Sequence, residues 1–123
     1  IDDFQEINEK YGYEVGDHII QHVSKTINSN LRSSDLISRF KDDEFAILLE
    51  DLTLDNASIL FKKIKKSLTQ EPAIIGDLSI SFHVSIGIFY GLEENLNSMI
   101  KKAIISLEYA KNNGKQQIVI NEH

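Results

Sequence analysis

Two short apolar runs separated by a cluster of charged residues most constrain how this chain folds. The runs cover residues 36–40 and 44–50, and most of their side chains are branched aliphatic or aromatic. Runs of this length and composition, bounded by a few polar residues, are typical of a β-hairpin. The tip of the predicted hairpin reads Lys41-Asp42-Asp43-Glu44. We therefore expect a turn that carries consecutive acidic residues.

Amphipathic segments lie on both sides of this hairpin. In residues 16–32, apolar side chains recur at positions 19, 20, 23, 27 and 31, which is the spacing of one buried helix face. By the same pattern we predict helices over 2–11, 16–32, 53–68 and 95–114, and further strands over 78–91 and 116–120. Helix, helix, hairpin and then alternating helix and strand indicate an α+β sandwich with a mostly antiparallel central sheet flanked by helices.

Local signals predict where the helices begin. Asp17 is expected to cap or favour the N-terminus of the second helix, after a short loop flanked by Gly12 and Gly16. Thr53 or Asp55 is expected to cap the third helix. A strand ahead of residue 1 would complete the alternation, so we expect the 123 residues to be a single domain that lacks its first strand and comes from a longer protein.

Composition narrows the classes of partner. The chain has no cysteine and a formal net charge of -6, which disfavours thiolate chemistry, broad nucleic-acid binding and anionic membranes. No apolar run approaches the ~20 residues of a membrane-spanning helix. We therefore expect a cytoplasmic domain with no nucleic-acid partner and no membrane contact.

The acidic turn allows two interpretations. Acidic residues commonly do no more than solvate a turn. Alternatively, because adjacent strand residues point to opposite faces, Asp43 could face a cleft and hold Mg²⁺, a hard ion that prefers oxygen ligands and substrate phosphates.

Four segments in register carry a resemblance to a known family. They are INEKYGYEVGD, RSSDLISRFKDDEF, VSIGI and AKNNGKQQIVI, and together they cover most of the chain. The set resembles the GGDEF family, the diguanylate cyclase domain that joins two GTP molecules into cyclic di-GMP. The resemblance implies a palm-like sandwich similar to nucleotidyl cyclases, with Mg²⁺ as cofactor, GTP or cyclic di-GMP as ligand, a homodimer, and attached sensor or output domains.

The family pattern assigns expected roles to residues. Asn8 and Asp17 match the pair that hydrogen-bonds guanine, although Asn8 could instead end a helix and Asp17 cap one. Asp43 and the backbone carbonyl of Ile1 match metal ligands, and the family's other acidic ligand would precede Ile1. Glu44 and Lys111 match catalytic positions, and Lys115 matches a phosphate contact.

The turn departs from the family pattern. Lys41 and Asp42 stand in place of two glycines that line the phosphates, where glycine permits positive φ and a close backbone approach. A carboxylate of Asp42 about 4 Å from a phosphate would be repelled by about 4 kcal/mol. Gln5, Glu9, Tyr13 and Lys115 also replace the usual residues.

A second expected site precedes the hairpin. Arg32 and Asp35 match the R-x-x-D motif that binds product cyclic di-GMP and inhibits members of the family, with Lys63 as an additional cation. The alternative is structural, since a cation favours a helix C-terminus and aspartate often begins a turn.

Three functions follow from the resemblance. The first is a degenerate GGDEF domain that binds guanine nucleotides or cyclic di-GMP and regulates an attached domain. The second is a working diguanylate cyclase, and the third is an interaction domain without a ligand.

Overall fold

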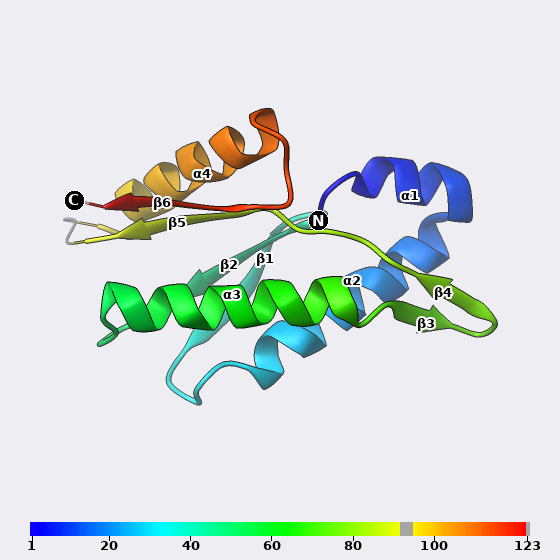
Figure 1. Ribbon diagram of the computed structural model, residues 1–123, viewed down its shortest axis with the longest axis horizontal. Helices are drawn as coiled ribbons and strands as arrows, with labels where there is room; N and C mark the ends of the chain where they lie inside the picture. The colour runs from blue at the N-terminus through cyan, green and yellow to red at the C-terminus, as the bar shows by residue number, and fades with distance from the viewer. Residues whose placement is uncertain (92–94, 123) are drawn as a thin grey trace. The chain divides into compact units, whose positions relative to one another are not determined.

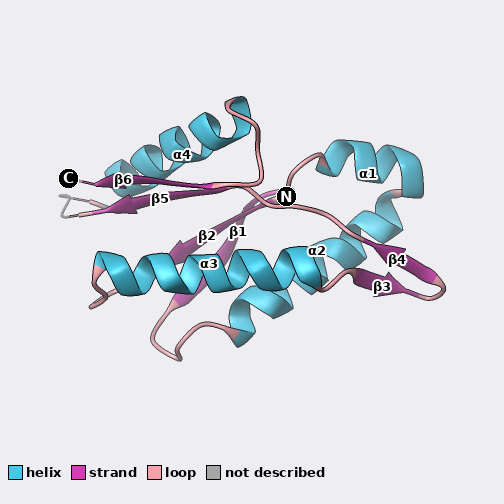
Figure 2. Ribbon diagram, viewed as in Figure 1, coloured by secondary structure: helices cyan, strands magenta, loops and turns pink. Residues whose placement is uncertain are grey.

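The computed structural model describes residues 1–91 and 95–122, and the chain alternates helices and strands through that part (Figure 1). The elements are α1 (Phe4–Tyr11), α2 (Tyr13–Ser29), β1 (Leu36–Lys41), β2 (Glu44–Leu48), α3 (Leu54–Gln70), β3 (Ala73–Ile75), β4 (Leu78–Ile80), β5 (Ile86–Tyr90), α4 (Leu96–Asn112) and β6 (Ile118–Glu122). This mixture of helices and strands confirms the predicted α+β class (Figure 2).

The described strands pair as three two-stranded ladders. β1 with β2 and β3 with β4 are antiparallel, and β5 with β6 is parallel. The parallel pair runs from Ile86 opposite Ile118 to Tyr90 opposite Glu122, and α4 provides the crossover between its strands. A crossover helix is what two parallel neighbours need, because a tight turn cannot join them.

Contacts divide the chain into two compact units, which we describe separately. The first contains Ile1 and Asp3–His83, and the second contains Asp2 with the segment that begins at Val84. In the first unit α2 packs against α3 and β3. Its core comes from the apolar faces of these helices and from neighbouring apolar side chains, namely Phe4, Ile19, Val23, Ile27, Phe61, Ile64, Leu68 and Phe82.

In the second unit, α4 lies along β5 and β6 (Figure 1). Gly87 of β5 makes this close packing possible, since a Cβ there would overlap backbone atoms of Ala103 and Leu107 in α4. Ala110 in the same helix is fully buried, and Ser106 is also buried. Small residues on both sides therefore let the helix backbone approach the strand.

The start of α2 differs from the prediction. The helix begins at Tyr13 with Gly12 at its N-cap, so Gly16 and Asp17 lie inside it rather than at a loop and a cap. The reason is that Gly12, at φ 93°, already reverses the chain after α1, and Val15 extends the buried face of α2 by one turn. The prediction for α3 is confirmed in one of its alternatives, because the Thr53 side chain accepts a hydrogen bond from the Asn56 N–H.

The predicted strand over 78–91 is wrong in its middle. The structure has β4 and β5 there, separated by residues 81–85 outside any strand, and a preceding strand β3 that the sequence pattern did not indicate. Phe82 and Val84 are buried between more exposed neighbours, so burial alternates as in a strand. Alternating burial of side chains indicates an extended chain with one buried side, whereas a β-strand also needs a hydrogen-bonded neighbouring strand.

Candidate functional site

Asn8, one of the two expected guanine-binding residues, lies where α1 contacts α2. Asn8 lies in the last turn of α1, and its Oδ1 atom is buried without a hydrogen-bond partner in the described part of the chain. This oxygen lies against Gly16, where any Cβ would overlap it, and Phe4 also borders the same position, with its Cζ 3.2 Å from where that Cβ would lie. Asp17, the next residue along α2, is exposed. Asn8 therefore packs against the residue that precedes Asp17 in α2, and a shared role of Asn8 and Asp17 stays a prediction.

A buried amide oxygen without a donor is costly. Leaving such a group unsatisfied costs about 1–3 kcal/mol, and a bound molecule that supplies an N–H would recover it. Guanine presents adjacent N–H donors and a carbonyl, which a side-chain amide and a carboxylate together match. Sequence reasoning missed this role of Gly16, because the predicted helix began at residue 16, whereas α2 begins at Tyr13 and has Gly16 inside it.

The acidic turn joins β1 to β2 through Asp42 and Asp43. Both lie in the turn itself, so the strand alternation used to orient Asp43 does not apply to it. Lys41 and Asp42 are exposed, and Asp43 is half-buried. Neither aspartate side chain forms a hydrogen bond or ion pair with any residue of 1–91 or 95–122. Both carboxylates are therefore available to a cation or exposed to an incoming anion.

The turn does not require glycine for its backbone. The non-glycine residues with positive φ among those described are Asp3, Asp51, Lys115 and Gln116, so Lys41, Asp42 and Asp43 all have negative φ. The positive φ that glycine would permit is therefore not used in this turn. The hairpin ladder is instead irregular between Arg39 and Lys41. What remains of the predicted effect is the bulk and charge of Asp42.

The expected metal ligands lie together. The backbone nitrogen of Ile1 donates a hydrogen bond of 3.1 Å to the carbonyl oxygen of Asp43. Within the described residues, no group of three or more His, Cys, Asp or Glu side chains is arranged to hold a metal ion. Mg²⁺ is commonly held by one or two carboxylates together with substrate phosphates and water, so the Asp43 carboxylate and the Ile1 carbonyl fit part of its shell.

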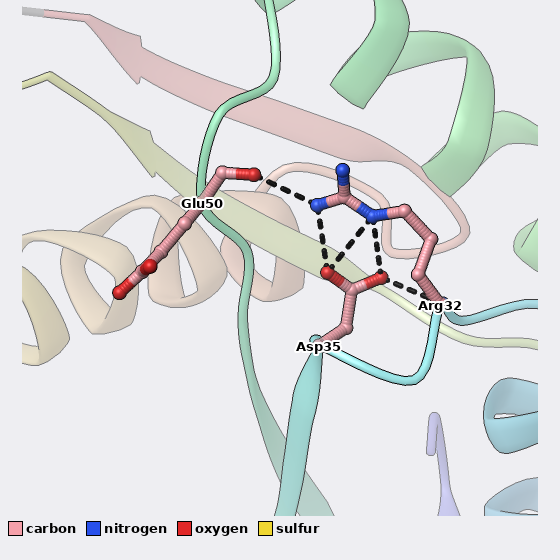
Figure 3. A network of polar contacts seen from close by, with 3 residues as sticks. All are labelled: Arg32, Asp35 and Glu50. Carbon is pink, nitrogen blue, oxygen red and sulfur yellow. Dashed lines mark hydrogen bonds and ion pairs between the residues drawn. The ribbon is translucent and has the colours of Figure 1, made fainter.

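Arg32 and Asp35 bind each other (Figure 3). Arg32 Nη2 lies 2.8 Å from Asp35 Oδ1 and donates a second bond of 2.7 Å to the backbone oxygen of Glu50. The Arg32 backbone N–H also donates to Asp35 Oδ2 at 2.8 Å. Only 1% of the Asp35 side chain is exposed, against 47% for Arg32. The pair closes the turn before β1 and fastens it to the chain that follows β2.

This pairing shifts both titrations. The side-chain hydrogen bond from Arg32, helped by the bond from its backbone N–H, lowers the pKa of Asp35. The same side-chain hydrogen bond raises the pKa of Arg32. The structure therefore supports the structural interpretation of R-x-x-D in this state, while its product-binding role stays a prediction. Lys63 is exposed on α3.

The remaining expected site residues are divided between the two units. Glu44 begins β2 in the first unit and is half-buried. Lys111, half-buried, ends α4 in the second unit, and Lys115 follows it in an exposed left-handed conformation at φ 59°. Their contacts with a nucleotide stay predictions.

Sequence reasoning also missed Asp2, a buried acid of the second unit. Its carboxylate accepts hydrogen bonds from Ser85 Oγ at 2.7 Å and from the Gln116 backbone N–H at 3.1 Å. It holds the segment after α4 against the start of β5.

No described helix combines the length and apolarity needed to cross a membrane.

Comparison with known proteins identifies the family. Residues 1–117 match the family described as diguanylate cyclase, GGDEF domain. The chain is 28% identical to diguanylate cyclase A of Treponema denticola, over 100% of this chain and 34% of that protein. It is 32% identical to the cyclic di-GMP phosphodiesterase NbdA of Pseudomonas aeruginosa, over 94% of this chain and 15% of that protein.

A solved structure agrees in fold. The GGDEF domain of PA1120 (YfiN or TpbB) from Pseudomonas aeruginosa superposes with a TM-score of 0.88 at 27% identity, covering 99% of this chain and 78% of that chain. The fold and the matched sequence define a domain of cyclic di-GMP metabolism. The chain belongs to the GGDEF family, and it spans about a third or less of the length of the two relatives named above.

Proposed function

We propose that this chain is a GGDEF domain that binds a guanine nucleotide and acts mainly as a regulatory module of a longer protein. The observation that carries the proposal is the buried Asn8 Oδ1, which has no hydrogen-bond donor among the described residues and lies against Gly16. Guanine carries N–H donors of the kind that this amide oxygen lacks, and the Asn8 amide would have to turn from Gly16 to meet them. The altered turn, with Asp42 where phosphates are expected, weakens the triphosphate end of the site.

A calorimetric titration tests this function. In buffer with MgCl₂, GTP is expected to bind and ATP is not, because adenine lacks the N–H donor pattern that Asn8 and Asp17 match. Asn8→Ala is expected to lower the affinity for GTP about tenfold or more, which corresponds to the loss of one well-made hydrogen bond to a buried partner. Equal binding of GTP and ATP, or no binding of either, would remove the proposal.

Cyclic di-GMP is the second ligand to titrate. Arg32→Ala is expected to weaken cyclic di-GMP and leave GTP unchanged, if the R-x-x-D pair opens to bind product. Loss of GTP binding in this variant would indicate that the pair only holds the hairpin in place.

A second candidate function is a working diguanylate cyclase. It is favoured by an Asp43 carboxylate that forms no hydrogen bond or ion pair with any described residue. In this function Asp43 and the Ile1 carbonyl would help hold Mg²⁺, Glu44 and Lys111 would take catalytic roles, and Lys115 would contact a phosphate. Two copies of the domain would present two GTP molecules to each other, and each 3′-oxygen would displace pyrophosphate from the opposite α-phosphate.

Chromatographic detection of cyclic di-GMP after incubation with GTP and Mg²⁺ separates the two functions. Little product is expected from the natural chain. The double variant Lys41→Gly with Asp42→Gly is expected to form more product, because it removes the charge and bulk near the phosphates. Strong activity in the natural chain would favour the cyclase.

A further inference from the structure

We propose that Arg39 is a positioning residue, which orients the peptide between Asp42 and Asp43 so that the Asp43 N–H faces the phosphates of a bound nucleotide. The inference rests on the proposed nucleotide-binding function and extends it to a residue outside the expected site. It follows from where the guanidinium of Arg39 binds.

Arg39 grips one backbone oxygen at the tip of the hairpin. Its Nη2 and Nε atoms donate hydrogen bonds of 2.6 and 3.1 Å to the carbonyl oxygen of Asp42. Acidic side chains follow directly in the sequence, yet Arg39 forms no ion pair with any acid in the described part of the chain. The guanidinium therefore acts on the backbone of the turn and leaves the carboxylates of Asp42 and Asp43 without a counterion from this residue.

Because the peptide group is planar, fixing the Asp42 carbonyl also fixes the direction of the Asp43 N–H. In a planar trans peptide, the carbonyl and the N–H of the next residue point in opposite directions. Because Arg39 holds the Asp42 oxygen on one side, the Asp43 N–H points to the other side. The Asp43 carbonyl is held as well, by the Ile1 nitrogen at 3.1 Å. Both peptide planes that meet at Asp43 are thus oriented by contacts from outside the turn.

The turn needs such a contact. Two-residue hairpin turns favour positive φ, which glycine supplies, whereas Asp42 and Asp43 have negative φ. The ladder is irregular between Arg39 and Lys41, immediately before the tip. The two hydrogen bonds from Arg39 to the Asp42 carbonyl span this irregular segment. They therefore fix the backbone of the tip, as ladder hydrogen bonds would in a regular hairpin. Outward backbone N–H groups at a fixed turn bind anions, which is how phosphates are commonly held.

Lys25 provides a matched control. It lines, with Arg39, a groove of about 360 Å³ between α2 and the hairpin. Unlike that of Arg39, the side chain of Lys25 forms no hydrogen bond or ion pair with the residues described. Removing Lys25 therefore takes the same charge from the same groove without releasing the turn.

The test compares Arg39→Met, Arg39→Lys and Lys25→Met in titrations with GTP and with guanosine. Both Arg39 variants are expected to lose about tenfold or more in GTP affinity, because neither methionine nor lysine can donate two hydrogen bonds in the fork geometry of arginine. Both are expected to keep their affinity for guanosine, because guanosine has no phosphate for the turn to bind. Lys25→Met is expected to keep the ratio of the two affinities. An equal loss in Lys25→Met, or full retention in Arg39→Lys, would show that charge alone matters and would overturn the proposal.

A second readout does not depend on nucleotide. In amide NMR spectra of the free protein, both Arg39 variants should shift the Asp43 and Glu44 resonances, and Lys25→Met should not. Unchanged tip resonances would overturn the positioning role even if GTP binds. If the natural chain binds neither GTP nor guanosine, the proposed function fails, while shifted tip resonances would still support Arg39 as the residue that orients the turn.

Discussion

At the scale of single residues, the site depends on close pairs rather than on isolated side chains. The Asn8 amide oxygen can be buried in its present position only because position 16 has no Cβ. Glycine inside a helix costs about 1 kcal/mol relative to alanine, so its presence in α2 needs a compensating reason. The space taken by the Asn8 amide is that reason.

Gly16→Ala separates this packing role from helix propensity. Alanine should favour α2 by about 1 kcal/mol, but its Cβ should displace the Asn8 amide and lower GTP affinity about tenfold. Calorimetry and urea unfolding measure the two effects. In an Asn8→Ala background, Gly16→Ala should no longer change GTP affinity, as a double-mutant cycle requires for directly coupled residues. An additive cycle would mean that the two residues do not act through each other.

The Arg32–Asp35 pair predicts a dependence of stability on pH. Because the pKa of Asp35 is lowered in the folded chain, its contribution is present above the unfolded pKa of about 4 and is lost as the pH falls through the folded pKa. The difference in unfolding free energy between the natural chain and Asp35→Asn should stay constant from about pH 7 to 5 and shrink below about pH 4. Urea titrations at each pH measure it. A difference that is independent of pH would exclude the pair as its source.

At the scale of elements, helices were easier to predict than strands. The helix over 53–68 was recognised together with Thr53 at its start, because capping and apolar spacing are local properties. The strand over 78–91 was not, because its division into β4 and β5 depends on which backbone finds a partner. β3 was missed for the same reason, since three residues carry too little pattern to identify a strand.

The packing of α4 against β5 should be sensitive to the addition of a single Cβ atom at Gly87. Gly87→Ala should destabilise the chain by about 3 kcal/mol or more, because its Cβ meets helix backbone that cannot move aside cheaply. Gly76→Ala is the control, since a Cβ there meets nothing within 4 Å and only its φ of 59° is unfavourable. That control should lose about 1–2 kcal/mol. Urea unfolding compares them, and equal losses would contradict the packing argument.

At the scale of the whole molecule, family membership and biochemical activity are separate conclusions. Residues 1–117 carry the family pattern, and the fold agrees with solved GGDEF domains. We expect activity to depend on a few atoms at the turn, where Lys41 and Asp42 bring charged side chains and have negative φ. The R-x-x-D motif was recognised from its spacing, yet only the coordinates reveal that Arg32 and Asp35 bind each other and Glu50.

The sequence by itself determined the α+β class, the helices and the hairpin with its acidic turn, because apolar periodicity, capping and turn chemistry act over a few neighbouring residues. Only the tertiary structure decided that Asn8 lies against Gly16, that Arg39 holds the Asp42 carbonyl and that Asp2 binds Ser85 and Gln116. These contacts form between segments that are far apart in the sequence or joined by a turn. Local sequence patterns do not determine which atoms of such segments come together.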